Sequence, residues 1–200
     1  MESGPLSERL AHVRAEVARC QARAGLTHAV RIVAVTKTHG PEAVLAAAAA
    51  GLTDVGENRV HEALPKQDAT RDVDVAWHLI GGLQRNKARH AIGRFALIHS
   101  VDRVELATEL ARRAADGHRQ AVLLQVNCSD EPAKGGVAPA GLPELLDAVS
   151  SLEALDVRGL MTMAAFDADE PAQRRTFSHL RALRDAAVAR GFVLPELSMG

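Results

Sequence analysis

The stretch Arg31-Ile-Val-Ala-Val-Thr36 is an apolar run that predicts a short buried strand, and Thr36-Lys37-Thr38-His39-Gly40 follows it. The turn after the first strand distinguishes two architectures for a chain of alternating strands and helices. A doubly wound sheet usually carries a glycine-rich phosphate loop there, G-x-G-x-x-G or G-x-x-x-x-G-K-[ST]. Neither pattern follows this strand. The first strand and its turn therefore favour a TIM-type (β/α) barrel.

Further apolar runs continue this alternation along the rest of the chain. Apolar residues at helical spacing, ended by glycines, predict helices between the strands. The later predicted strands are 53–56, 75–80, 96–101, 121–127, 157–162 and 194–199, and the predicted helices are 5–24, 41–51, one from about 59, 84–91, 102–117, 142–149 and 169–191. Strands that alternate with helices indicate βαβ units and a parallel sheet. We expect one α/β domain over 1–200.

Composition excludes several classes of protein. The 200 residues carry 24 Lys and Arg against 25 Asp and Glu, so no basic excess points to nucleic acid or an anionic membrane as a partner. Cys20 and Cys128 are far apart, which is neither a disulfide framework nor a zinc pattern and is typical of a reducing cytosol. The charges in 1–20 predict no signal peptide, and no stretch is apolar enough to span a bilayer. We expect a cytoplasmic monomer.

Lys37 is the strongest candidate for a reactive residue, because it follows the first predicted strand and barrel enzymes place their active sites at the carboxyl ends of the strands. Desolvation at the end of a buried strand would lower the pKa of the lysine amine and make it a nucleophile. Schiff-base formation with an aldehyde needs such an amine. Spacing alone leaves two ordinary alternatives open: Lys37 could point into solvent, or it could pair with Glu57.

Other candidate residues lie at or near strand ends, and each has an ordinary structural reading. Asn58 could cap the helix that follows it, and His78 is more often a hydrogen-bonded core histidine than a ligand or base. Glu57 is better read as a structural ion partner than as a general base. His61-Glu62 starts like a zinc helix motif, but Pro65 stands where the second histidine would be, so we expect no metal site.

Several short motifs follow one another in a fixed order over essentially the whole chain. They are Ala34-Val-Thr-Lys37-Thr, Gly56-Glu-Asn58-Arg-Val-His-Glu62, Trp77-His-Leu-Ile-Gly81-Gly-Leu-Gln-Arg-Asn86-Lys87, Ile98-His-Ser-Val-Asp102-Arg, Val126-Asn127, Lys134-Gly-Gly136, Gly159-Leu-Met161 and Leu197-Ser-Met-Gly200. Together they resemble the pyridoxal phosphate homeostasis protein family, whose fold is similar to the N-terminal barrel of alanine racemase. The departures are mild: Thr36 and Gly135 stand where serine is usual, and His39-Gly40 replaces a lysine before proline.

The resemblance implies a role for each of five residues. Lys37 matches the lysine that forms a Schiff base with pyridoxal 5′-phosphate, and Asn58 and His78 match polar positions at the barrel mouth near the cofactor. Met161 matches a residue close to the cofactor ring, and Ser198 belongs to the segment that leads into the phosphate site. The resemblance assigns no catalytic residue.

The resemblance also implies a function. Family members are generally cytosolic, show no established turnover, and store or deliver the cofactor, with apo forms of pyridoxal-phosphate enzymes as possible recipients. The alternative is a pyridoxal-phosphate enzyme of the racemase or decarboxylase barrel type that acts on amino acids. An alanine-type racemase is expected to need a tyrosine base, and the sequence contains no tyrosine.

The family pattern continues past Ser-Met-Gly200 with segments that bind the phosphate and supply an eighth strand. Barrel phosphate sites are built from the loops after strands seven and eight, and closure needs the eighth strand. We therefore expect a C-terminally incomplete barrel of seven strands, with unpaired edges on the first and last. A further alternative is a fragment that folds poorly and binds nothing firmly.

Overall fold

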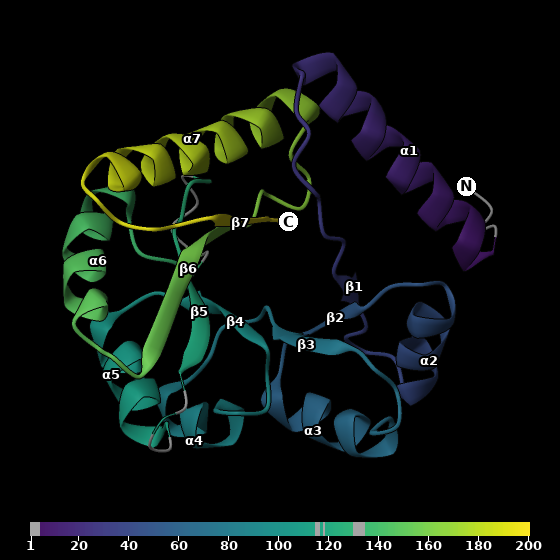
Figure 1. Cartoon of the computed structure of the whole chain (residues 1–200), viewed down its shortest axis with the longest axis horizontal. Coiled ribbons are helices and arrows are strands. Elements are labelled where there is room, and N and C mark those ends of the chain that lie inside the picture. Colours follow the sequence, from purple (N-terminus) through teal and green to yellow (C-terminus); the bar gives the residue numbers. More distant parts are fainter. Residues whose placement is uncertain (1–4, 115–116, 118, 130–134) are drawn as a thin grey trace.

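Seven parallel strands form one curved sheet in the computed structural model, which describes residues 5–114, 117, 119–129 and 135–200 (Figure 1). The strands are β1 (Ala34–Val35), β2 (Asp54–Glu57), β3 (Ala76–Leu79), β4 (Leu97–Val101), β5 (Gln120–Gln125), β6 (Leu155–Thr162) and β7 (Glu196–Met199). The helices are α1 (Leu6–Ala24), α2 (Pro41–Ala49), α3 (Val60–Ala69), α4 (Ala88–Ala91), α5 (Val104–Arg113), α6 (Leu142–Ser150) and α7 (Glu170–Ala189), with short 3₁₀ turns at Arg85–Lys87 and Pro139–Gly141.

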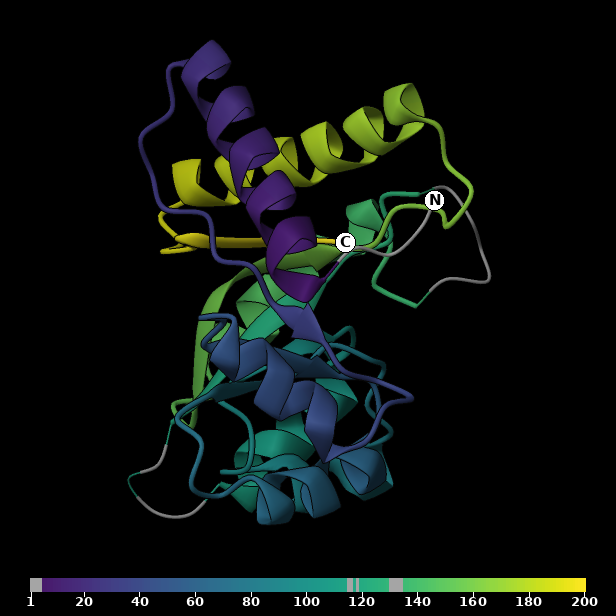
Figure 2. The same ribbon diagram turned by 90° about the vertical axis from the view of Figure 1, so that its right-hand side faces the viewer.

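The order of the strands in the sheet is their order in the chain, and each pairs in parallel with the next. Helices lie between successive strands, as βαβ units require. The predicted α/β class and barrel-type curvature are confirmed. Within the described ranges there is no eighth strand, and β1 and β7 are the two edges of the sheet. Figures 1 and 2 both place α1 and α7 at one end of the molecule and α3, α4 and α5 at the other.

The main apolar core lies between the sheet and helices α3 to α7. Side chains alternate between the two faces of a strand, so Ile98, Leu124 and Leu160 pack under these helices. A second cluster joins α1 and α2 to β2 and includes Leu10 and Val55. The only tryptophan, on β3, packs against both clusters.

The opposite, concave face of the sheet carries a small apolar cluster of its own. It consists of Leu97, Ala121, Leu123 and Met161, all at most 8% exposed. These residues come from β4, β5 and β6 and fill the middle of the concave face. The polar residues of the candidate site surround them on neighbouring strands.

The first strand is shorter than predicted. The sequence predicts a strand over 31–36, but the ladder of β1 holds only Ala34 and Val35, paired with Val55 and Gly56. An edge strand gains hydrogen bonds from one neighbour only, and Val35 is 48% exposed. The other strands and the helices begin and end within a few residues of their predicted bounds.

Candidate functional site

Lys37 lies in the turn that follows β1, at the carboxyl-terminal end of the parallel sheet. The backbone N–H of Thr36 still donates to the carbonyl oxygen of Gly56, at 3.0 Å, and the chain then turns sharply. Thr38 has a φ of 67°, the only positive value among the non-glycine residues described. A left-handed threonine is strained and persists only where its surroundings hold it. The turn therefore gives Lys37 a fixed backbone position, with its side chain exposed.

Glu57 does not pair with Lys37, which settles one of the alternatives left open by the sequence. Its partner is Lys66 of α3, whose Nζ lies 2.7 Å from Oε1 of Glu57. Both side chains are buried, at 9% and 0% exposure. The Lys66 Nζ also donates to the carbonyl oxygen of Thr36 at 2.9 Å, and the Thr36 hydroxyl donates to Glu57 at 2.6 Å. These three residues, the Thr36–Glu57–Lys66 cluster, anchor the turn that carries Lys37.

Sequence reasoning identified Glu57 as an ion partner but missed Lys66. A signal for Lys66 was present, because it follows Val60 and Ala63 on the buried stripe of α3. A lysine at apolar spacing on a helix is a candidate for a buried, paired charge.

His78 lies within β3 and is hydrogen-bonded through both ring nitrogens. Its Nε2 lies 2.9 Å from Oδ1 of Asp54, and its Nδ1 lies 2.9 Å from Nε2 of His99. Nδ1 of His99 lies 2.9 Å from Oγ of Ser198. We refer to Asp54, His78, His99 and Ser198 as the concave-face relay. His78 is 1% exposed and His99 3%, so neither ring is open to a ligand in this arrangement.

Burial controls the charge of both histidines. Desolvation lowers the pKa of His99 to about 3, with further lowering by His78 and Arg31. Burial also lowers the pKa of His78, although the hydrogen bond and charge of Asp54 act in the opposite direction. Both rings are therefore neutral near pH 7. Sequence reasoning did not select His99, because its partner Ser198 is 99 residues away and meets it only through the curvature of the sheet.

Asn58 and Met161 take different places in the site. Asn58 directly follows β2 and is half-buried, but it does not cap α3, whose N-cap residue is Arg59. Gly81 packs against it: a Cβ at Gly81 would lie 2.7 Å from the Cα of Asn58 and nearer still to its carbonyl oxygen. Met161 is 3% exposed in the concave-face apolar cluster and is in register with Ser198. It forms part of the floor below the strand ends.

A hollow of about 220 Å³ lies at the carboxyl ends of β5 and β6, lined by Gln125, Val126, Asn127, Gly135, Thr162 and Met163. Gly135, which belongs to the Lys134-Gly-Gly136 motif, borders it. Lys134 is outside the described residues, but Gly136 has a φ of 122° and leaves no room for a Cβ, which would lie 2.7 Å from the backbone nitrogen of Asn127. The backbone N–H of Val137 then donates to the Gln125 carbonyl oxygen at 2.9 Å. The loop is thus fastened to the end of β5.

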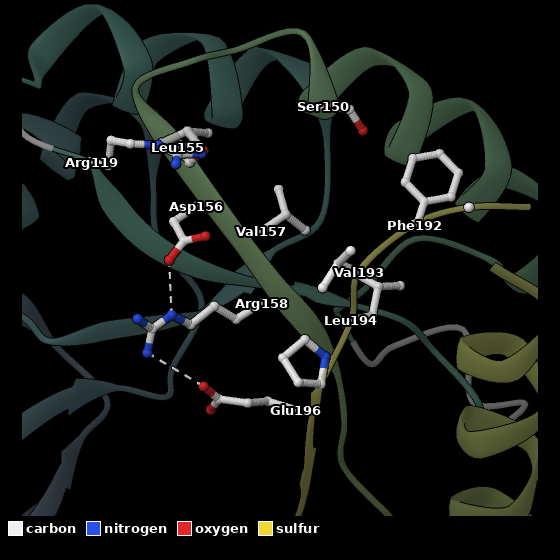
Figure 3. A pocket seen from close by; sticks show the side chains of 12 residues that line it. Arg119, Ser150, Leu155, Asp156, Val157, Arg158, Phe192, Val193, Leu194 and Glu196 are labelled. Carbon is white, nitrogen blue, oxygen red and sulfur yellow. Dashed lines mark hydrogen bonds and ion pairs between the residues drawn. The ribbon is translucent and has the colours of Figure 1, made fainter. Parts of the chain in front are cut away.

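A second hollow, of about 520 Å³, lies at the opposite end of the strands (Figure 3). The amino-terminal half of β6 and the segment before β7 line it. Its most prominent charge, Arg158, donates to Asp156 at 2.9 Å and to Glu196 at 3.4 Å. None of the predicted site residues borders this hollow, and Arg158 is already paired. The carboxyl-terminal end of the sheet is therefore the better candidate site.

Two further classes of site find no support in the part of the chain that the structure describes. It contains no group of three or more His, Cys, Asp or Glu side chains able to hold a metal ion. Among the same residues, no helix combines the length and the apolar character that crossing a bilayer requires.

Comparison with known proteins matches this chain over nearly its full length. The family model of the alanine racemase N-terminal domain matches residues 9–200. The pyridoxal phosphate homeostasis protein of Aquifex aeolicus is 39% identical over 196 residues, which cover 96% of this chain and 86% of that protein. The protein of the same name from Pseudomonas aeruginosa is 42% identical over 180 residues, covering 89% and 78%.

Solved structures agree with these matches. PipY from Synechococcus elongatus, solved with pyridoxal phosphate (PLP) bound, has a TM-score of 0.82 and 37% identity, covering 97% of this chain and 88% of PipY. Alanine racemase from Clostridium difficile has a TM-score of 0.74 at 14% identity, covering 96% of this chain and 50% of the racemase. The racemase likeness concerns the fold alone.

Proposed function

The chain belongs to the alanine racemase N-terminal domain family, and on this premise we propose that it binds pyridoxal 5′-phosphate reversibly through Lys37. Its role is then cofactor storage and delivery in the cell rather than catalytic turnover. Relatives at 39% and 42% identity are named pyridoxal phosphate homeostasis proteins, and the PipY structure at 37% identity has PLP bound.

The observation that carries this proposal is the position of Lys37. Its primary amine is exposed at the carboxyl end of β1, on a turn fixed by the Thr36–Glu57–Lys66 cluster. The cofactor supplies an aldehyde, which condenses with such an amine to form a C=N bond as its oxygen leaves as water. Among the described residues the Lys37 side chain has no hydrogen bond or ion pair to give up.

The other candidate residues fit the same end of the sheet. Asn58 and Ser198, both half-buried, are proposed to contact the cofactor directly, and Met161 to support its ring from below. His78 is proposed to act on the site through His99 and Ser198, because its own nitrogens are occupied. The glycine loop at Gly136 offers backbone N–H groups beside the hollow at β5 and β6.

The proposal extends to partners and location. Apo forms of pyridoxal-phosphate enzymes are the expected recipients of the cofactor, and the protein is expected to act as a cytoplasmic monomer. Neither nucleic acid nor membrane is part of this role, in keeping with a net charge of −1.

Borohydride reduction tests the role of Lys37. The protein is incubated with pyridoxal 5′-phosphate, reduced, and mapped by peptide mass spectrometry. We expect one phosphopyridoxyl group on Lys37 in the unmodified chain, and its loss in Lys37→Ala. Lys87→Ala is the matched control, because Lys87 is also exposed but lies on the turn after β3. A reduced adduct of the same stoichiometry in Lys37→Ala would contradict the proposal.

A further inference from the structure

The concave-face relay has only one consistent order of hydrogens. An ionised carboxylate only accepts hydrogen bonds, so the hydrogen between Asp54 and His78 belongs to Nε2 of His78. A neutral imidazole carries a single N–H, so Nδ1 of His78 must accept from Nε2 of His99. Nδ1 of His99 then accepts in turn, and the only hydrogen left for it is that of the Ser198 hydroxyl. Every hydrogen bond in the relay points from Ser198 towards Asp54.

The environment of the relay holds this order in place. Three of its members are buried: Asp54 is 7% exposed, His78 1% and His99 3%. Water therefore has little access to the relay and cannot readily reverse the direction of its hydrogen bonds. Burial of the two rings lowers the pKa of each, which keeps them neutral. The second carboxylate oxygen of Asp54 is occupied as well, because the Thr53 hydroxyl donates to Oδ2 at 2.8 Å. The positive charge of Arg31 lies 3.6 Å from Oδ1 of Asp54.

The relay also joins parts of the sheet that do not pair with each other. Its members lie on β2, β3, β4 and β7, and β4 is not a neighbour of β7 in the sheet. The bond between His99 and Ser198 therefore crosses the concave face and reaches the edge strand β7. Figure 1 shows the two strands that carry these residues, β4 and β7. Ser198 is half-buried next to the carboxyl end of that strand, the same end of the sheet at which Lys37 follows β1, so its oxygen is not enclosed by the relay alone.

We propose that Asp54, His78 and His99 are positioning residues that hold the Ser198 hydroxyl hydrogen directed at Nδ1 of His99. Ser198 then meets a ligand only as a hydrogen-bond acceptor. This inference rests on the proposed function for the identity of the ligand. Its consequence is specificity: Ser198 accepts from an N–H or O–H of the bound cofactor. A phosphate dianion only accepts, so its oxygens find no donor at Ser198 while the relay keeps this order.

The tautomers of the two histidines test the relay without any cofactor. Long-range ¹H–¹⁵N spectra of ¹⁵N-histidine-labelled protein at pH 7 should show both His78 and His99 protonated at Nε2 and bare at Nδ1. The His99→Asn variant assigns the signals. Either ring protonated at Nδ1 in the unsubstituted protein would overturn the proposal, whatever the behaviour of any variant.

Asp54→Asn supplies the sharpest perturbation. If the Thr53 hydroxyl keeps its bond to the side-chain oxygen of residue 54, the new NH₂ group faces His78 and donates to it. Both histidines are then expected to switch to the Nδ1–H tautomer, which releases the Ser198 hydrogen. Arg31→Gln is the control: it removes the nearby charge but leaves the carboxylate, and the tautomers should stay as they are. Unchanged tautomers in Asp54→Asn, or switched ones in Arg31→Gln, would count against the relay.

Cofactor affinity tests the consequence for Ser198. We expect Ser198→Ala and Asp54→Asn each to weaken binding of pyridoxal 5′-phosphate about tenfold. The first removes the accepting oxygen, and the second frees the hydroxyl hydrogen to turn towards the donor group of the cofactor. The double variant should bind no more weakly than Ser198→Ala alone. Losses that multiply to about a hundredfold would show that the two residues act separately and would overturn the inference. Absence of binding by the unsubstituted protein would instead refute the proposed function, while the cofactor-free spectra would still decide the relay.

Discussion

The Nζ atom of Lys66 lies 2.9 Å from the carbonyl oxygen of Thr36, the residue that immediately precedes Lys37. A helix on the convex side of the sheet is thereby fastened to the backbone that presents the candidate amine. The same Nζ pairs with Glu57 in a nearly water-free position. The position of the candidate lysine, Lys37, thus depends on a second lysine that is buried.

Lys66→Met tests the strength of this anchor. The substitution leaves the Glu57 carboxylate buried without its partner, and removal of one member of a buried ion pair costs about 3–5 kcal/mol. We expect urea unfolding to show a loss of that size. The double variant Glu57→Gln with Lys66→Met leaves no unpaired charge and should be clearly more stable than the single variant. If the single and double variants lose equal free energy of unfolding, the unpaired Glu57 carboxylate is not the main cause of the destabilisation.

Two adjacent glycines provide a matched pair for the packing under Asn58. A methyl group at Gly81 would overlap the backbone of Asn58, whereas nothing lies within 4 Å of a Cβ at Gly82. Gly81→Ala should therefore destabilise the protein by about 1–3 kcal/mol and weaken cofactor binding, because β3 and Asn58 must move apart. Gly82→Ala should change the free energy of unfolding by less than about 0.5 kcal/mol. Similar denaturation midpoints for the two variants would refute this account.

Acid should destabilise the protein through His99. Its pKa is about 3 in the folded chain and about 6.5 when unfolded, so between these values the unfolded chain binds the extra proton. The free energy of unfolding should therefore fall as pH drops below about 6.5, by up to about 1.4 kcal/mol per pH unit for this proton. Above pH 6.5 this contribution is complete.

Urea unfolding between pH 7 and 5 measures this slope while most carboxylates remain ionised. His99→Asn should show a shallower slope than the unsubstituted chain. His61→Asn is the control, because the His61 side chain is 72% exposed. A slope in His99→Asn as steep as in the unsubstituted chain would assign the acid sensitivity to other groups.

The alternative of a pyridoxal-phosphate enzyme makes a different prediction. With the cofactor bound, we expect no exchange of the α-proton of alanine with deuterated solvent at an enzymatic rate, because the sequence offers no tyrosine to serve as the second base. Proton exchange followed by NMR measures this directly. Exchange that depends on Lys37 and converts L-alanine into a mixture of L- and D-alanine would favour the alternative of a racemase.

Much of the fold could be predicted because its signals are local. The apolar run at 121–127 and the glycine stop at Gly191 depend on a few neighbouring residues, and β5 and α7 lie within a few positions of their predicted bounds. The prediction of a longer β1 was wrong for a physical reason. Arg31, Ile32 and Val33 have the composition of a strand, but the sheet offers a partner on one side only, and the ladder begins at Ala34.

The candidate site was less accessible to sequence reasoning. Lys37 and Glu57 stand out because each follows a strand predicted from the sequence, which is a local signal. Lys66, which binds Glu57 and the backbone before Lys37, is recognised only when a helix packs on the sheet. His99, which joins His78 to Ser198, is recognised only when the sheet curves to bring β4 opposite β7. The resemblance to a family supplied the role of Lys37, and the structure supplied the contacts that hold it.

Trp77 packs where the two large apolar clusters meet, and it is the only tryptophan in a sequence without tyrosine. Its neighbour in the chain, His78, belongs to the concave-face relay. The intrinsic fluorescence of this protein therefore originates from one indole, on the same strand as His78. Energy transfer from that indole to a bound, light-absorbing cofactor should quench the emission, so loading and release can be followed in real time without any added label.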